Sequence, residues 1–336
     1  MPFSVVAKGM DPGFRRGDES NILNFQLKST LRITAAAMPW LTFRAFLANF
    51  IRLDPESTRY GEPKLFPKET VSVPKANACK ILKYDDGVFS WAKDPVVEEC
   101  RAEIYVNGQL YVAVMATPAQ LDYLTIGYLF TEGAINAVSD IKGIAVNGLS
   151  VRAELWSNPP GPPFRARSSG FGSGSVTVKN IQANDLTPVN AEPPTIMAER
   201  IIELMGEFNQ LSELFWQTGA VHSAWLVRGE RRYFSEDVGR HNALDKVIGQ
   251  SLSDEASSAQ TGLIFITGRI STEMVLKAAK AGVAALISRG SASGLAVELA
   301  EKINLILIGF SRGNQFKAFW GGQYLSALGS CGNAHE

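Results

Sequence analysis

The sequence has few cysteines, few histidines and no excess of charge of either sign, and each shortage excludes a class of protein. Its 336 residues include three cysteines and three histidines. Cys79, Cys100 and Cys331 are scattered without C-x-x-C spacing, which argues against a disulfide framework or a structural zinc site and favours a reducing cytoplasm. The 33 basic and 33 acidic residues cancel, so no global field attracts nucleic acid or a membrane surface.

A membrane span and an export signal are also not expected. The most apolar stretch, residues 34–51, contains Pro39 and Arg44 and is barely long enough, since a spanning helix needs about 20 uninterrupted apolar residues. It lies too far from the first residue for a secretory signal. Residues 1–75 contain seven prolines and no sustained periodicity, so we expect a poorly ordered extension there.

Residues 97–185 are expected to form a smaller α+β domain. Two β-prone runs within residues 103–112 flank Asn107-Gly108, a pair that tolerates positive φ, and this predicts a hairpin. Thr117 as N-cap, followed by proline, predicts the start of a helix that ends at Gly133. The domain ends in a loop-rich segment with a run of glycines and serines.

Residues 195–325 are expected to form an α/β domain. A long helix is predicted over 195–216, followed by short apolar strands that alternate with helices. The predicted strands are 221–228, 262–267, 283–287 and 305–310, and the predicted helices follow His241 and cover 274–282 and 295–303. Such alternation indicates crossover connections and a parallel sheet with helices on its faces.

Four loops at the predicted carboxyl ends of this sheet carry an arginine beside glycine or serine. The arginines are Arg240, Arg269, Arg289 and Arg312. Ligands of such sheets bind outside these ends, and guanidinium groups match phosphate oxygens, which predicts a phosphate-bearing ligand. The alternative is that each arginine pairs with a local acid such as Glu273 or Glu298.

The run from Asp237 to Lys246, DVGRHNALDK, is the most unusual helix start in the chain. Gly239 lets a backbone approach closely, and a helix N-terminus favours negative charge, so Arg240, His241 and Asn242 could face an anion. The alternative is a capped helix in which Arg240 pairs with an acid of the same run. Both interpretations remain open from spacing alone.

Several catalytic motifs are missing from the sequence. It has no zinc-deaminase ligand pattern, no G-x-S-x-G elbow, no Walker A loop and no G-x-G-x-x-G after a strand. His222 lies in an apolar run, which favours a core or sheet-face position. His335 lies in the C-terminal tail and gives no indication of function.

The Asp237–Lys246 run closely resembles the core motif of the formate dehydrogenase accessory sulfurtransferase (FdhD) family. The likeness extends over about residues 97 to 320 and includes several separate motifs in order. They are Val106-Asn107-Gly108, Thr117-Pro118, Gly127, Glu132-Gly133, Thr267–Ser271 with Glu273-Met274, Ser288 with Gly294-Leu295-Ala296, and Gly309–Arg312.

This resemblance implies an α/β fold, with a cytidine-deaminase-like αβα C-terminal domain without zinc, preceded by a smaller α+β domain. It implies a cytoplasmic homodimer that takes persulfide sulfur from a cysteine desulfurase. The sulfur would pass to the molybdenum bis(molybdopterin guanine dinucleotide) cofactor of formate dehydrogenase. The cofactor-binding stretch falls on Phe310, Ser311, Arg312, Gly313, Asn314 and Gln315, with Arg240, His241, Asn242, Arg269 and Arg289 as weaker candidates.

The sequence departs from the family in the loop that carries sulfur. The sulfur-bearing cysteine falls on Gly170 or Phe171, and the second cysteine falls on Ser173. Persulfide chemistry needs a thiolate, which none of these residues supplies. Three interpretations follow: transfer on a substitute thiol, with Cys331 as the candidate, a non-catalytic chaperone that binds the cofactor, or a folded but inactive relative.

Overall fold

The computed structural model describes residues 76–159, 165–167, 192–254 and 261–327. All of these residues belong to one unit, Phe66–Glu336. The predicted extension over 1–75, the glycine loop with Gly170, Phe171 and Ser173, and Cys331 lie outside the described residues. The predicted domain boundaries stay predictions.

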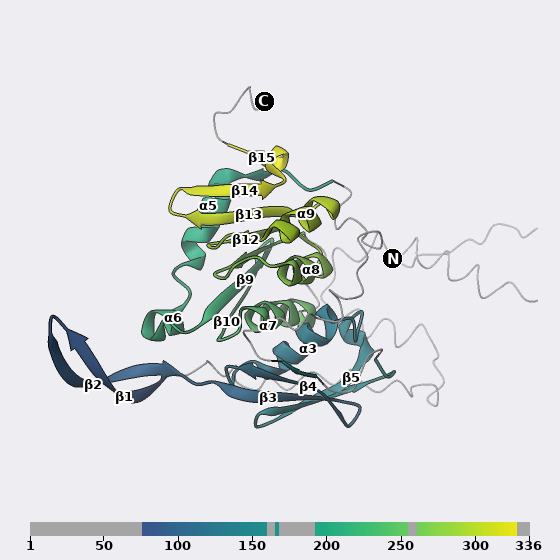
Figure 1. Ribbon diagram of the computed structural model, residues 1–336. Coiled ribbons are helices and arrows are strands. Elements are labelled where there is room, and N and C mark those ends of the chain that lie inside the picture. The colour runs from purple at the N-terminus through teal and green to yellow at the C-terminus, as the bar shows by residue number, and fades with distance from the viewer. Residues whose placement is uncertain (1–75, 160–164, 168–191, 255–260, 328–336) are drawn as a thin grey trace, which may run out of the picture. The chain divides into compact units, whose positions relative to one another are not determined.

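A six-stranded mixed sheet forms the centre of the C-terminal half (Figure 1). Its strands lie in the order β10-β9-β11-β12-β13-β14. They are β9 (His222–Arg228), β10 (Arg231–Asp237), β11 (Gly262–Ile266), β12 (Val283–Ser288), β13 (Ile306–Arg312) and β14 (Gln315–Trp320). The expected strands are present, but the prediction of a wholly parallel sheet is wrong: only β11–β12 and β12–β13 pair in parallel.

Two tight turns explain the antiparallel pairs of this sheet. Gly229, with φ 53°, lies in the short turn between β9 and β10, and Gly313, with φ 56°, lies between β13 and β14. Strands joined by so few residues can pair only antiparallel. The stretch 311–314, predicted as a loop after the last strand, is therefore the end of β13 and the turn that leads into β14.

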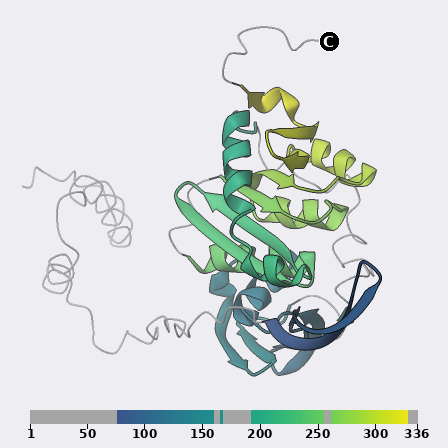
Figure 2. The same ribbon diagram turned by 90° about the vertical axis from the view of Figure 1, so that its left-hand side faces the viewer.

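Helices cover both faces of the six-stranded sheet, which confirms the αβα layering (Figures 1 and 2). On one face α5 (Ala198–Phe208) buries Ile201, Leu204, Met205 and Phe208. On the other lie α7 (Arg240–Ser253), α8 (Thr272–Lys280) and α9 (Gly294–Lys302). The more specific likeness to cytidine deaminase stays a prediction.

The long helix predicted over 195–216 is two helices, α5 and α6 (Glu213–Thr218). The α-helical turns stop at Asn209, and Ser212 donates its hydroxyl to the buried carboxylate of Glu236. Glu236 also accepts a hydrogen bond at 3.3 Å from the amide of Phe215, in the first turn of α6. A distant carboxylate thus binds the start of the second helix, so an apolar period alone does not keep a helix continuous.

A five-stranded sheet, in the order β5-β6-β3-β4-β7, forms the other half. Its strands are β3 (Cys100–Val106), β4 (Gln109–Ala116), β5 (Ile141–Asn147), β6 (Ser150–Leu155) and β7 (Arg165–Arg167). The predicted hairpin is confirmed: Asn107 and Gly108 join β3 to β4 with φ of 48° and 81°. Positive φ at both positions matches the twist of the flanking strands.

The helix of this half, α3 (Leu121–Thr131), begins later than predicted. Gln120, with φ 56°, occupies the N-cap position, and Thr117 makes no cap. The Thr117 hydroxyl lies instead 3.1 Å from Oδ2 of Asp237. The predicted end at Gly133 is confirmed by its φ of 82°.

Helices α3 and α7 cross in close contact at two glycines. A Cβ on Gly127 would lie 1.8 Å from the carbonyl oxygen of Asp245, and one on Gly249 would lie 2.0 Å from that of Tyr123. Neither distance is possible for real atoms, so only glycine allows the two backbones to pack here. This crossing joins the five-stranded sheet to the six-stranded one.

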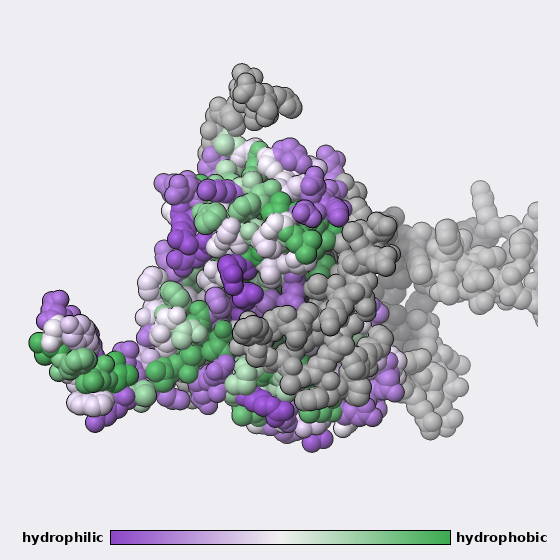
Figure 3. Space-filling model, viewed as in Figure 1, coloured by the Kyte–Doolittle hydropathy of each residue, from purple (hydrophilic) through white to green (hydrophobic). Residues whose placement is uncertain are grey.

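A hairpin of β1 (Ala76–Asp85) and β2 (Val88–Val97) precedes the region where order was expected to begin. Its turn is Asp86-Gly87, again with positive φ at both residues. Hydrophobic residues gather along it in Figure 3, and Trp91 is 66% exposed. Strand β2 contacts α6. The remaining short elements are η1 (Val138–Asp140), β8 (Ile196–Met197), η3 (Gly322–Tyr324) and β15 (Leu325–Ser326).

Candidate anion-binding site

The four arginine loops lie side by side along one edge of the six-stranded sheet. A Cβ on Gly268, after β11, would lie 3.0 Å from Cδ of Arg240. A Cβ on Gly290, after β12, would lie 3.1 Å from the carbonyl oxygen of Gly268, and the amide of Phe310 donates to the Gly290 carbonyl at 2.9 Å. We call this edge the arginine rim, defined by Arg240, Arg269, Arg289 and Arg312.

Arg240 is half-buried beside the exposed Arg269, and their positive charges repel each other. Burial lowers the pKa of the Arg240 guanidinium, the charge of Arg269 lowers that pKa further, and the Glu273 carboxylate opposes both effects. Nε of Arg240 is buried and, among the described residues, has no hydrogen-bond partner. A buried unpaired donor beside a like charge is costly unless an anion is bound.

Within the part of the chain that the structure describes, no rim arginine forms a salt bridge with a local acid, and the Glu273 carboxylate acts on Arg240 only at longer range. No ion pair between described residues includes Arg240, Arg269, Arg289 or Arg312. Oε2 of Glu273 lies 3.1 Å from Nε2 of His241 instead, without the alignment of a hydrogen bond. Arg312 donates from Nε to the Arg289 carbonyl at 3.2 Å, which ties two rim loops together.

Both acids of the Asp237–Lys246 run form ion pairs with lysines rather than with Arg240. Oδ2 of Asp237 lies 2.6 Å from Nζ of Lys246, and both side chains are fully buried. Asp245 pairs at 2.8 Å with Lys277. The alternative in which Arg240 pairs with one of these acids is therefore wrong.

Asn242 also points inward. Its amide donates to the carbonyl of Met115 at 2.7 Å and to Oδ1 of Asp237 at 2.9 Å. These bonds use both hydrogens of the amide, so we leave Asn242 out of the proposed site. The run is divided: Arg240 and His241 belong to the rim, while Asp237, Asn242 and Lys246 hold strand β4 and the turn after it.

Phe310 occupies an unusual backbone conformation on the rim. Its φ is 52°, in the left-handed region that aromatic residues rarely adopt, and the residue is 39% exposed. Nζ of Lys317 lies 4.9 Å from the centre of its ring. Such strain concentrates at functional sites, and here it presents an aromatic face beside the arginines. Ser311, in contrast, is buried.

His222 lies at the rim, where sequence reasoning had not placed it. β9 runs antiparallel to β11, so the first residue of β9 meets the edge at which β11 ends. Nδ1 of His222 lies 3.4 Å from Oγ1 of Thr267 and 3.4 Å from the position of a Cβ on Gly268. Of the two predicted positions, core or sheet face, the core is wrong because His222 is only half-buried: an antiparallel partner brings its amino end to this edge.

Neither described cysteine is a ready sulfur carrier at the rim. Cys100 is buried in β3, and burial, with the charge of Asp237, raises its pKa to about 11. Cys79 is exposed in the β1–β2 hairpin.

Among the described residues, no group of three or more His, Cys, Asp or Glu side chains could hold a metal ion. No helix of the described residues is long and apolar enough to span a bilayer.

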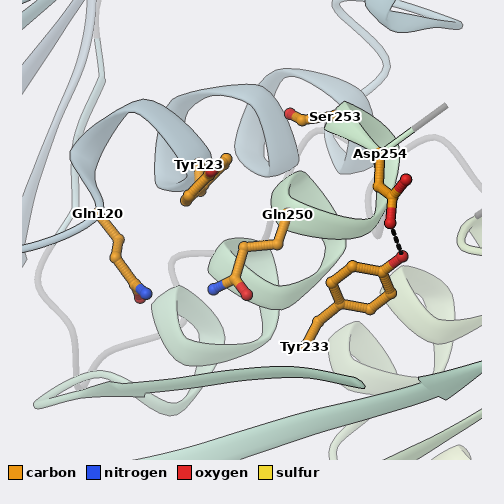
Figure 4. A pocket seen from close by; sticks show the side chains of 6 residues that line it. All are labelled: Gln120, Tyr123, Tyr233, Gln250, Ser253 and Asp254. Carbon is orange, nitrogen blue, oxygen red and sulfur yellow. Dashed lines mark hydrogen bonds between the residues drawn. The ribbon is translucent and has the colours of Figure 1, made fainter. Parts of the chain in front are cut away.

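A shallow pocket lies apart from the rim residues (Figure 4). Its volume of about 240 Å³ is below the roughly 300 Å³ at which ligand pockets usually begin. The Tyr233 hydroxyl donates to Asp254 across it at 2.8 Å. The lining residues are Gln120, Tyr123, Tyr233, Gln250, Ser253 and Asp254. They share no residue with the rim, which we take as the candidate site.

The fold and the rim together define an α/β protein with a row of unneutralised arginines at the edge of a mixed sheet. Comparison with known proteins then identifies the family. Residues 97–325 match the model of the FdhD/NarQ family, and the chain belongs to this family.

Curated relatives agree with this assignment. A sulfur carrier protein FdhD from Geobacillus kaustophilus is 35% identical over 71% of this chain and 93% of its own. One from Wolinella succinogenes is 32% identical over 70% and 84%. The crystal structure of a proposed formate dehydrogenase accessory protein from Desulfotalea psychrophila shares the fold, with a TM-score of 0.61 at 24% identity over 75% of this chain and 100% of that one.

Proposed function

We propose that this chain is an accessory protein of formate dehydrogenase that holds the molybdenum bis(molybdopterin guanine dinucleotide) cofactor on the arginine rim. The observation that carries the proposal is the unneutralised pair of Arg240 and Arg269, whose repulsion a bound anion would relieve. A guanine dinucleotide contains a pyrophosphate group, and guanidinium forks bind phosphate oxygens in pairs.

The residues present fit such a ligand in two further respects. Nε of Arg240 supplies a buried donor without a partner among the described residues, which a phosphate oxygen could satisfy. Phe310 is 39% exposed, and stacking of a guanine base on its ring, in competition with Lys317, would be worth about 1–3 kcal/mol. Arg269, Arg289 and Arg312 would hold the remaining phosphate oxygens, with Gly313, Asn314 and Gln315 at the turn beside them.

The proposed setting is the cytoplasm, with the chain acting as a homodimer between a cysteine desulfurase and formate dehydrogenase. The family's relatives are named sulfur carriers, but the loop that should carry sulfur has glycine, phenylalanine and serine at the relevant positions. Holding the cofactor needs no thiol. We therefore propose cofactor binding as the function of this chain and keep sulfur transfer as the second candidate.

The binding proposal is tested by thermal unfolding of the full chain with GDP as the probe. A ligand at 100 times its Kd stabilises by about 2.7 kcal/mol, which raises Tm by roughly 5–10 °C in a domain of this size. Arg312→Ala should weaken GDP binding by about tenfold or more, because it removes a charge-assisted contact. Arg200→Ala is the control, since Arg200 is exposed on α5 and pairs with Glu203. No shift at millimolar GDP would reject the proposal.

Sulfur transfer on a substitute thiol is the second candidate, favoured by the exposed position of Cys79. Incubation with a cysteine desulfurase and cysteine, followed by intact-mass measurement, decides it. A sulfur adduct that survives in Cys79→Ala but disappears in Cys331→Ala, or the reverse, would name the carrier. An unchanged mass in the wild-type chain would leave cofactor binding as its function.

A further inference from the structure

We propose that His222 is a phosphate-contacting residue of the arginine rim, which enters as a neutral donor and gains a proton when a polyanion binds. This inference rests on the proposed function and adds a residue to that site. It makes cofactor binding depend on pH, with tighter binding as pH falls.

The position of His222 follows from its neighbours. Its Nδ1 and the Cδ of Arg240 both lie close to the point that a Cβ on Gly268 would occupy, at 3.4 Å and 3.0 Å from it. Both side chains therefore lie against Gly268. An anion that reaches Arg240 next to this glycine also meets the imidazole.

We assign the tautomer of His222, and so the nitrogen that is free to contact a ligand, from its contact with Thr267. Thr267 Oγ1 accepts a hydrogen bond from the amide of Ser223 at 3.0 Å, which leaves its own hydrogen directed elsewhere. That hydroxyl lies 3.4 Å from Nδ1 of His222 and can donate to it. Nδ1 is then the acceptor, so the neutral ring carries its proton on Nε2. Nε2–H is the donor available to a phosphate oxygen.

Charged groups on the packed elements keep this ring neutral before a ligand binds. Burial lowers the pKa of His222 first, the charges of Arg240 and His241 on α7 lower it further, and Asp237 on β10 opposes them. Asp237 is engaged with Lys246, so it does little to attract a proton to the ring. The cations therefore outweigh the nearby acid in their effect on the ring until an anion is bound.

Binding reverses this balance. Phosphate charges within about 4–6 Å favour the protonated imidazole, as an opposite charge does for any histidine. The complex then takes up to one proton, and affinity rises by up to about tenfold per unit of falling pH. This window lies between the lowered pKa of the free protein and the higher one of the complex. Above the second value and below the first, affinity is independent of this residue.

The test uses diguanosine pyrophosphate, two guanosines joined through a pyrophosphate, because its phosphates hold no proton between about pH 6 and 8. Calorimetric titration of the full chain in buffers of different ionisation enthalpy measures the protons taken up. We expect uptake of roughly half to one proton per ligand near pH 7, the range in which histidine titrates. We also expect affinity to be higher near pH 6 than near pH 8.

Variants assign the proton to its residue. His222→Gln keeps an N–H donor but cannot become charged, so it should abolish the uptake and leave affinity near pH 8 within about twofold of wild type. His335→Gln is a matched control in the C-terminal tail, and His241→Gln tests the other rim histidine. Circular dichroism and Tm confirm that each variant is folded.

Each result has one meaning. Binding with unchanged proton uptake in His222→Gln overturns the inference while the proposed function stands. Uptake lost in His241→Gln and retained in His222→Gln overturns it in favour of the other histidine. Absence of any binding by the wild-type chain rejects the proposed function, and the role of His222 with it.

Discussion

Replacing Lys246 with methionine tests how strongly a buried ion pair stabilises the contact between the two sheets. Nζ of Lys246 lies 2.6 Å from Oδ2 of Asp237 and 2.8 Å from Oγ1 of Thr117. Both members of the pair have no exposed side-chain area. Thr117 belongs to the turn after β4, so the ammonium joins the five-stranded sheet to helix α7. Methionine keeps the volume and removes the charge.

The magnitude follows from what remains after the substitution. Removing one partner of a buried pair leaves an uncompensated charge and costs about 3–5 kcal/mol. Asp237 still accepts bonds from the amides of Thr117 at 3.0 Å and Gly239 at 2.8 Å, and from Asn242 at 2.9 Å. These neutral donors partly satisfy the carboxylate. We therefore expect a loss near the lower end, about 3 kcal/mol of unfolding free energy.

Urea unfolding at neutral pH, read by circular dichroism, measures this loss from the shift in midpoint at constant slope. Lys83→Met is the matched control, because the Lys83–Asp85 pair is exposed at 58% and 69% and contributes at most about 1 kcal/mol. The double variant Asp237→Asn with Lys246→Met removes both charges. Its loss should be smaller than the sum of the two single losses by about 2 kcal/mol, the coupling of a contacting pair.

Two outcomes would refute this reasoning. The first is a loss of unfolding free energy in Lys246→Met that is no greater than the loss in Lys83→Met. Burial would then add nothing to the strength of the ion pair. The second is additivity in the double variant, which would mean that the two charges do not interact across the 2.6 Å that separates them.

Three further predictions concern packing, pH and thiol reactivity. Gly127→Ala should cost at least about 3 kcal/mol in urea unfolding because α3 and α7 must separate, whereas Gly206→Ala, with nothing within 4 Å of the new Cβ, should stabilise α5 by about 0.5–1 kcal/mol. Burial raises the pKa of Glu236, so the ionised carboxylate destabilises the native state at pH values above the ordinary glutamate pKa. Glu236→Gln should therefore be more stable than wild type at neutral pH. This difference in stability should vanish near about pH 4, where the glutamate is protonated. With a pKa of about 11, only about one thousandth of Cys100 is ionised near pH 8, so mass mapping after brief iodoacetamide treatment should find Cys79 modified and Cys100 intact until urea is added.

Local patterns in the sequence were enough to predict the elements near the rim. Alternating apolar segments predicted β11, β12 and β13 and the helices between them, since periodicity reports which residues face a core. Asn107-Gly108 predicted its hairpin because positive φ at both positions is a property of the residues themselves. The same rule applied to Asp86-Gly87 would have found the β1–β2 hairpin.

The sequence also determined where the rim arginines lie along the chain. Each lies at or shortly after the carboxyl end of a strand, so a sheet in which these strands run parallel to one another brings them to one edge. The same reasoning did not predict the order and direction of the strands. Short turns at Gly229 and Gly313 make β9 pair antiparallel with β10, and β14 with β13. That pairing brings His222 to the rim.

What only the tertiary structure decided is how the Asp237–Lys246 run divides its residues. Arg240 and His241 lie on the rim, while Lys246 contacts Thr117, a partner 129 positions away. Spacing along one helix shows which side chains share a face, but not which distant group occupies the space opposite. The close crossing at Gly127 and Gly249 and the exposed ring of Phe310 depend on such long-range contacts in the same way. The sequence determined the family and the local elements, and three-dimensional packing determined which of these residues are free to bind.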